Sequence, residues 1–123
     1  MAADPIVYCL TRDHSLAAAL DERLTGALTF CYNDAARLHQ AVTLRAPDMV
    51  VVDTAAVRAE YGDAGLGPVF DFLRRRVPDA RLSVRPTAGV AHLVAAEAGP
   101  RVDLLPVELA GCVDAVAAAC GSE

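Results

Sequence analysis

The stretch APDMVVVDT, from Ala46 to Thr54, decides the fold of this chain. Its apolar run, Met49 to Val52, contains three consecutive valines, which are stiff at χ1 and favour a pleated strand. Because the run is apolar at every position, it is typical of a central strand in a parallel sheet that helices cover on both faces. The carboxylate of Asp53 follows at the carboxyl end of this strand. Ligands collect at that edge of open α/β sheets, so Asp53 is the first candidate site residue.

The composition is that of one globular domain spanning residues 1–123. With 54% hydrophobic and 22% charged residues, the chain can bury a sizeable core. No apolar run approaches the roughly 20 residues of a membrane-spanning helix, and no basic segment followed by an apolar one marks a secretory signal. The net charge of −5 argues against a nucleic-acid surface. We therefore expect a cytoplasmic protein that binds neither membranes nor nucleic acid.

The cysteines and the basic residues restrict the kinds of site that this chain can form. The chain has four cysteines: Cys9, Cys31, Cys112 and Cys120. None forms a CxxC pair and each lies in an apolar stretch, so we expect buried free thiols in a reducing cytosol rather than disulfides or metal ligands. All 11 basic residues are arginine, so no lysine is available to any site.

Strand-like and helix-like patterns alternate along the chain. Strands are expected at 6–10, 28–31, 49–52, 81–84 and 102–105. The last helix is expected to open at Pro106, because proline is tolerated in a first turn. The glycine-rich segment from Thr54 to Gly67 is irregular, and we expect a long loop there with a helical turn at Ala55 to Glu60. Five strands alternating with five helices predict right-handed crossovers and a doubly wound parallel sheet.

This order of elements, with Asp53 ending the third strand, resembles the CheY-like receiver domain of bacterial two-component response regulators. The resemblance spans nearly the whole chain. Its best stretches are Ile6 to Leu20, Ala46 to Asp53, Val77-Pro78-Asp79 and Asp103 to Pro106. It implies a flavodoxin-like (βα)5 fold with strand order 2-1-3-4-5. It also implies a switch that is set by phosphorylation of the aspartate, a reaction that depends on positioning and charge neutralisation.

In the family, an acidic pair after the first strand holds Mg²⁺ beside the aspartate that accepts the phosphoryl group. Carried over to this sequence, Asp53 matches the phosphoacceptor. The acidic pair falls on Thr11 and Arg12, with Asp13 just beyond. A single carboxylate beside an arginine is a poor magnesium site, because the ion prefers oxygen ligands. These three residues therefore form a degenerate acidic pocket.

The family also places a hydroxyl after the fourth strand and a lysine before the proline that opens the last helix. The nearest hydroxyl is Thr87, where Arg85-Pro86 shifts the register. The lysine position, immediately before Pro106, is Leu105. These departures predict a pseudo-receiver that lacks ordinary Mg²⁺-dependent phosphorylation, a resident metal or cofactor, and catalytic residues.

A more specific hypothesis concerns Arg12. It occupies the position of a metal ligand, and an arginine beside a partly buried carboxylate keeps that carboxylate ionised and paired. We expect Arg12 to reach Asp53 and to replace both the metal and the lysine. Each residue also has a purely structural interpretation, in which Asp53 accepts loop hydrogen bonds, Arg12 is solvated and Asp13 caps a helix.

Three functions remain open from the sequence. The first is a signalling module that binds proteins without turning over a substrate. Its partners would be a histidine kinase or an output regulator, and the alanine-rich face of residues 88–120 would be a partner or homodimer interface. The second is a working receiver that a histidine kinase phosphorylates at Asp53 with Mg²⁺. The third is a small α/β ligand-binding domain or enzyme, since a fold does not determine a function.

Overall fold

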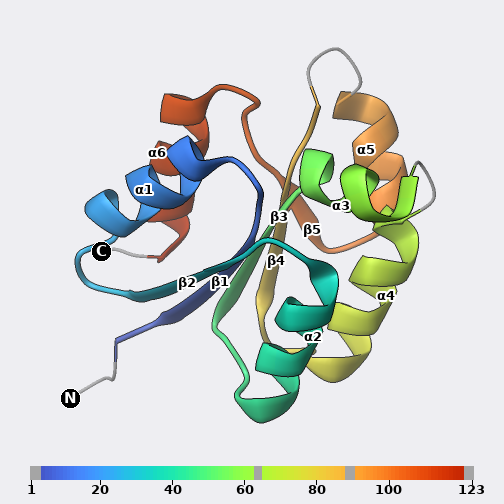
Figure 1. The fold of residues 1–123 in the computed structure, drawn as a ribbon, viewed down its shortest axis with the longest axis horizontal. Helices are drawn as coiled ribbons and strands as arrows, with labels where there is room; N and C mark the ends of the chain where they lie inside the picture. Colours follow the sequence, from blue (N-terminus) through green and yellow to red (C-terminus); the bar gives the residue numbers. More distant parts are fainter. Residues whose placement is uncertain (1–3, 63–64, 88–90, 121–123) are drawn as a thin grey trace.

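The computed structural model describes residues 4–62, 65–87 and 91–120 of the chain. Five parallel strands form a single sheet in the order β2-β1-β3-β4-β5 (Figure 1). The strands are β1 (Ile6–Leu10), β2 (Leu28–Tyr32), β3 (Met49–Asp53), β4 (Arg81–Arg85) and β5 (Val102–Leu104). This confirms the predicted α/β flavodoxin-like fold and its strand order. The strands β1 and β3 are buried along their whole length, as their unbroken apolar runs predict.

Helices connect the strands and cover the sheet on both sides. They are α1 (His14–Arg23), α2 (Ala35–Leu44), α3 (Thr54–Tyr61), α4 (Leu66–Arg76), α5 (Ala91–Ala98) and α6 (Leu109–Cys120). Helices α1 and α6 lie on one face, and the other four lie on the opposite face (Figure 1). Among the described residues, no helix combines the length and the apolar character that crossing a membrane requires.

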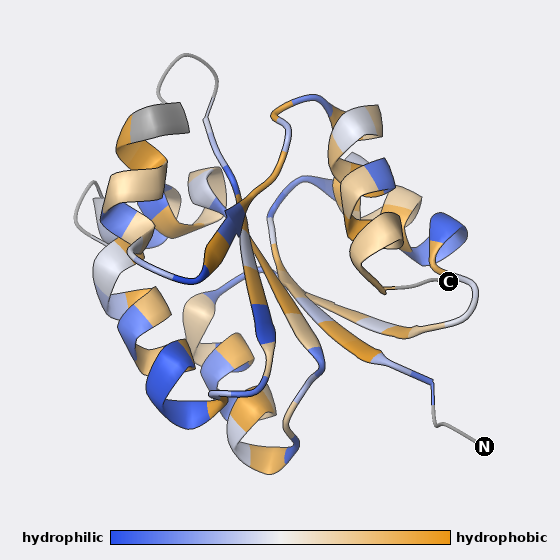
Figure 2. Ribbon diagram, turned by 180° about the vertical axis from the view of Figure 1, so that it is seen from behind, coloured by the Kyte–Doolittle hydropathy of each residue, from blue (hydrophilic) through white to orange (hydrophobic). Residues whose placement is uncertain are grey.

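The core is divided by the sheet into two clusters. The larger one lies beneath α2 to α5 and includes Val50, Val52 and Phe70. The smaller one lies beneath α1 and α6 and includes Val7 and Val51. Alternate side chains of one strand point to opposite faces of a sheet, so the valine run of β3 contributes to both clusters. Figure 2, which is coloured by residue hydropathy, shows hydrophobic residues along the central strands.

The long loop that we predicted between residues 54 and 67 is wrong, although the helical turn predicted at Ala55 to Glu60 lies within a helix. Residues Thr54–Tyr61 form α3, a helix that begins directly after Asp53, and α4 begins at Leu66. The crossover from β3 to β4 therefore carries two helices, and the described chain has six rather than five. Burial explains the difference, because Ala56 and Val57 pack into the larger core cluster. This packing stabilises α3, although the local sequence favours a helix only weakly.

The last helix also begins later than predicted. Pro106 lies in a loop, and α6 begins at Leu109 after the carbonyl of Glu108 accepts the first helical hydrogen bond, from the Cys112 amide. The prediction that all four cysteines are buried is wrong for Cys120, which is half-buried, and for Cys31, which is exposed. For Cys31 the reason is topological, because β2 is an edge strand and pairs only with β1.

Candidate functional site

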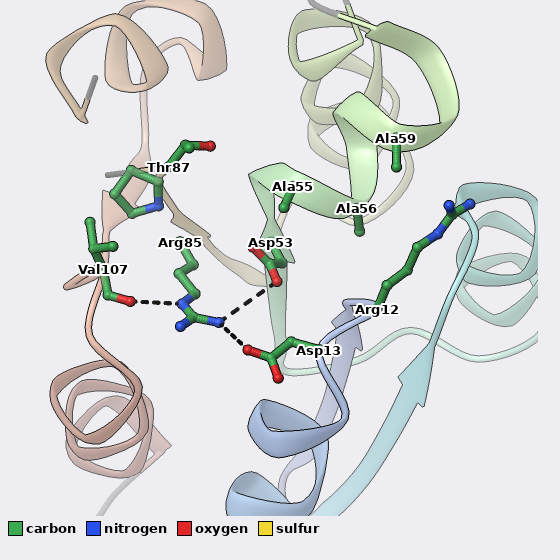
Figure 3. Close-up of a pocket in the computed structure, with 10 residues that line it drawn as sticks. Arg12, Asp13, Asp53, Ala55, Ala56, Ala59, Arg85, Thr87 and Val107 are labelled. Carbon is green, nitrogen blue, oxygen red and sulfur yellow. Dashed lines mark hydrogen bonds and ion pairs between the residues drawn. The ribbon is translucent and has the colours of Figure 1, made fainter. Parts of the chain in front are cut away.

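The candidate site is a cavity of about 430 Å³ at the carboxyl edge of the sheet (Figure 3). The ends of β1, β3 and β4 meet there, together with the loop between β5 and α6. Its lining comprises Arg12, Asp13, Asp53, Ala55, Ala56, Ala59, Arg85, Pro86, Thr87 and Val107. The parallel topology brings these segments together because every strand of the sheet ends at the same edge.

Asp53 lies at the floor of this cavity. It is the last residue of β3 and is only 6% exposed. Its Oδ2 accepts a hydrogen bond of 2.7 Å from the hydroxyl of Thr11, which is itself buried at the end of β1. A buried carboxylate needs such partners because an unpaired charge is costly to remove from water. The position predicted for the phosphoacceptor is therefore a buried, hydrogen-bonded carboxylate.

The second partner of Asp53 is Arg85, the last residue of β4. Asp53 and Arg85 are register partners in the paired strands β3 and β4. The Nη1 atom of Arg85 lies 3.8 Å from Oδ2 of Asp53 and 3.1 Å from Oδ2 of Asp13. Its Nε donates a 3.0 Å hydrogen bond to the carbonyl of Val107. Figure 3 shows the guanidinium between these three groups, and we call Arg85 with Asp13 and Asp53 the arginine clamp.

Asp13 joins the clamp to the first helix. Its Oδ1 accepts hydrogen bonds from the amides of Ser15 and Leu16, so it caps the N-terminus of α1. Its Oδ2 accepts a hydrogen bond from Arg85. The pKa of Asp13 is lowered, first by that hydrogen bond and then, against some desolvation, by the two amides. The structural interpretation of Asp13 as a helix cap is confirmed.

The expected contact between Arg12 and Asp53 is wrong. The Nε of Arg12 donates to the carbonyl of Asn33 at 3.0 Å, on the exposed side of the β2–α2 connection. Figure 3 shows its side chain directed away from Asp53. The physical reason is strand register. Arg85 enters the site from within the neighbouring strand β4, whereas Arg12 belongs to a loop that turns toward β2.

The remaining predicted positions lie around the clamp. Leu105, at the position of the family's lysine, is buried in the smaller core cluster. Its backbone amide donates a hydrogen bond to the carbonyl of Val84. Pro106 is exposed in the loop that presents the Val107 carbonyl to Arg85. Thr87 lines the cavity and is exposed. The first residues of the alanine-rich face of residues 88–120, residues 88–90, lie outside the described residues.

Sequence reasoning missed Arg85, although a signal was present. Strand β4 was expected to end at Val84 because Arg85 precedes a proline. In the structure both β3 and β4 have five residues and pair from Met49 with Arg81 onward, so the fifth residues, Asp53 and Arg85, are partners. The residue before a proline favours extended backbone, which is compatible with a strand. Counting β4 one residue further would have found the clamp.

Comparisons with known proteins identify the fold of this chain but do not assign it to a family. No family model matches the chain, and no curated protein matches its sequence. One similar solved structure, from Burkholderia pseudomallei, carries the provisional description of a pilus assembly-related protein. It is 22% identical with a TM-score of 0.61, over 100% of this chain and 96% of that one. A second, from Burkholderia thailandensis, is provisionally described as the pilus assembly protein CpaE. It is 20% identical with a TM-score of 0.60, over 91% of this chain and 94% of that one. At this identity the likeness establishes a shared fold.

Proposed function

We propose that this chain is a receiver-like signalling module that acts through protein contacts and does not use Mg²⁺-dependent aspartyl phosphorylation. The observation that carries the proposal is the arginine clamp. A guanidinium lies within 4 Å of both Asp13 and Asp53, in the position between two carboxylates that a divalent cation would take in an ordinary receiver. Arg85 supplies the positive charge there as part of the chain.

The residues of the site fit a magnesium ion poorly. Mg²⁺ requires near-octahedral oxygen ligands, and three of the four carboxylate oxygens of Asp13 and Asp53 already accept hydrogen bonds. Oδ2 of Asp53 accepts from Thr11, and Asp13 uses one oxygen for Arg85 and the other for the first amides of α1. Binding the ion would require Arg85 to leave and Asp13 to give up its contacts. We therefore expect no resident metal or cofactor and no turnover of a substrate.

The phosphoryl group itself would also lack a partner. In receivers a lysine before the last helix stabilises the transferred group, and here that position is the buried side chain of Leu105. The chain has no lysine elsewhere. Arg85 is the nearest cation to Asp53, but its guanidinium is held by Asp13 and by the Val107 carbonyl. Both observations favour a site that is fixed in one conformation.

The partner in this proposal is another protein. Leu93 of α5 and Leu104 of β5 are 51% and 46% exposed, on the face where we expect a partner or a second copy to bind. The provisional descriptions of the two similar structures make bacterial pilus assembly the first system in which to look for that partner. Histidine kinases and output regulators remain candidates from the receiver resemblance. We place the module in the cytoplasm, a reducing compartment that is typical of chains with free cysteines.

Incubation with acetyl phosphate and Mg²⁺, followed by intact-mass measurement, tests this proposal. We expect no phosphoryl adduct on the wild-type protein under conditions that fully modify an ordinary receiver in the same tube. We also expect no chemical-shift change near Asp53 on adding beryllofluoride with Mg²⁺. The matched control is Asp53→Asn. An adduct on the wild type that is absent from this variant would overturn the proposal and establish a working phosphoacceptor.

A further inference from the structure

Two cysteines that the proposed function does not use lie side by side on neighbouring strands. Cys9 of β1 and Cys31 of β2 are register partners in a parallel pair. Side chains of register partners in parallel strands point to the same face of the sheet. Cys9 is fully buried, whereas Cys31 is exposed on the edge strand. The pair therefore combines one thiol that reagents can reach with one that only its neighbour can reach.

The electrostatic surroundings make the two thiols unequal. A hydrogen bond with Cys9 lowers the pKa of Cys31, although desolvation and the charge of Asp21 oppose this. The pKa of Cys9 is raised well above its ordinary value, first by the hydrogen bond with Cys31 and then by burial. Since the thiolate is the nucleophile, Cys31 is the first thiol to react with an oxidant. Cys9 is suited to react second, at close range.

Cys31 also opens onto a cavity of its own. This cavity, of about 240 Å³, is separate from the floor of the clamp site. It is lined by Thr11, Arg12, Asp13, His14, Ala17, Cys31, Tyr32, Asn33 and Arg37. The carboxylate of Asp13 is already paired with Arg85. Arg37 is likewise paired with Asp34 at 3.4 Å, whereas Arg12 donates to the neutral carbonyl of Asn33. Arg12 therefore supplies most of the positive field at this cavity, which attracts small anions toward the reactive thiol.

We propose that Cys31 and Cys9 form a reversible dithiol–disulfide site whose oxidant is a small anionic disulfide. In the first step the Cys31 thiolate attacks one sulfur of the small disulfide. A mixed disulfide forms at Cys31, and one small thiolate leaves. In the second step Cys9 loses its proton to water and attacks the Cys31 sulfur, which releases the other small thiolate. Two protein thiols are oxidised to one disulfide, and one small disulfide is reduced to two thiols.

Strand geometry makes such a disulfide easy to reduce again. Adjacent strands lie about 4.8 Å apart, which is within the Cα separation that a disulfide accepts. The Cβ atoms of a disulfide prefer about 3.8 Å, so bridging register partners requires the strands to move together locally. Strained disulfides have more oxidising potentials and are the labile ones. The edge strand β2 can make this movement because it pairs only with β1.

The site lies close enough to the clamp to affect it. The residue after Cys31 is Tyr32, whose carbonyl accepts the amide of Thr11, and Thr11 donates to Asp53. Drawing Cys31 toward Cys9 therefore moves the backbone that positions the Thr11 hydroxyl. The redox site itself does not depend on whether Asp53 is phosphorylated, and the two proposals can fail separately.

Incubating the protein in a series of oxidised and reduced glutathione mixtures tests the redox site. Cleavage after arginine places Cys9 in peptide 1–12, Cys31 in peptide 24–37, and both Cys112 and Cys120 in peptide 102–123. We expect peptides 1–12 and 24–37 to become linked, with loss of two of the four thiols and full recovery on adding dithiothreitol. Linkage through peptide 102–123 instead, or no linkage at any glutathione ratio, would overturn the proposal.

Single variants separate the two steps. The Cys9→Ser variant should accumulate one glutathionyl group on Cys31, because the second step is blocked. The Cys31→Ser variant should gain neither a glutathionyl group nor an internal disulfide. A glutathionyl group on Cys9 in Cys31→Ser, or its absence from Cys31 in Cys9→Ser, would contradict the assigned order.

The double variant Arg12→Ala, Arg37→Ala tests the anionic preference without touching either thiol. At low salt its oxidation by oxidised glutathione should be slower by roughly 3- to 10-fold, because the field that attracts the anion is weaker. Its oxidation by neutral 2-hydroxyethyl disulfide should match that of the wild type. Equal slowing with both reagents would show that the arginines act on the structure of the thiol pair and would overturn the proposed oxidant class.

Discussion

A single guanidinium, that of Arg85, connects the site residues at the carboxyl edge of the sheet. Arg85 contacts Asp13 in the β1–α1 connection, Asp53 at the end of β3 and the carbonyl of Val107 in the β5–α6 connection. Arginine suits this position because its planar group remains charged and presents several donors at once. Its side chain is 14% exposed and that of Asp53 is 8% exposed, so water screens this pair less than a surface ion pair.

Removing Arg85 should therefore destabilise the fold. In Arg85→Ala the buried carboxylate of Asp53 keeps Thr11 but loses its counter-charge, and we expect a loss of about 1–3 kcal/mol in the free energy of unfolding. Urea denaturation measures this change. The matched control is Arg12→Ala, which removes an exposed arginine and should change the free energy by less than about 0.5 kcal/mol. Equal losses from the two variants would contradict the assignment of the clamp to Arg85.

The lowered pKa of Asp13 predicts a pH dependence. A carboxylate with a lowered pKa in the folded state stabilises the protein above its unfolded pKa of about 3.9, and this contribution is lost as the pH falls through the folded pKa. Asp13→Asn keeps a helix-capping oxygen but removes the charge. The difference in unfolding free energy between wild type and Asp13→Asn should thus be constant above about pH 5 and shrink below about pH 4.

The same pH series in an Arg85→Ala background is the control for that prediction. Because Arg85 is the largest cause of the lowered pKa, the effect of Asp13→Asn should depend much less on acid pH there. A pH dependence that is unchanged by the loss of Arg85 would mean that the helix-capping amides, and not the clamp, hold the Asp13 charge.

The sequence predicted which residues reach this edge of the sheet but not which of them touch. Asp53 and Asp13 were placed correctly because each is fixed by a local pattern, the end of an apolar run and the start of a helix. The contact partner of Asp53 depends instead on how two strands distant in sequence are aligned. Local patterns do not determine such a register to one residue, and an error of one residue exchanges the inward and outward side chains.

Among the elements, α3 shows most clearly how packing overrides a weak local signal. This helix has no side-chain hydrogen bond at its N-cap and no long apolar face, and a loop was expected there. The helix is stabilised by Ala56 and Val57 in the core and by an ion pair of 3.1 Å between Arg58 and Glu97 of α5. A local window of the sequence does not report the ion pair, since Glu97 lies 39 residues from Arg58.

The junction between α3 and α4 depends on Gly65. A Cβ at this position would lie 2.7 Å from Cγ1 of Val57 and 2.8 Å from Cβ of Tyr61. Gly65→Ala should therefore push α4 away from α3 and lower the unfolding free energy by about 1–3 kcal/mol. Thermal unfolding followed by circular dichroism measures this loss. The control is Gly26→Ala, where a Cβ meets nothing within 4 Å, and a larger loss in the control would refute the explanation.

At the scale of the whole molecule, the sheet was predictable because its signals are redundant. Two fully apolar strands, β1 and β3, require helices on both faces, and right-handed crossovers then leave few strand orders to choose from. The similar solved structures share this fold at 20% and 22% identity, so the fold persists where most individual residues differ. The chemistry at the sheet edge depends on single residues, and this is why the fold was easier to predict than the site.

Magnesium binding distinguishes a fixed charge cluster from a phosphorylation site most directly. Backbone amide signals near Asp13 and Asp53 should be recorded by NMR while Mg²⁺ is added to the wild type and to Arg85→Ala. We predict no saturable change in the wild type, and binding in the variant, where two carboxylates face each other without the guanidinium. Saturable binding of Mg²⁺ to wild-type protein at Asp13 and Asp53 would contradict the assignment of Arg85 as the cation of this site.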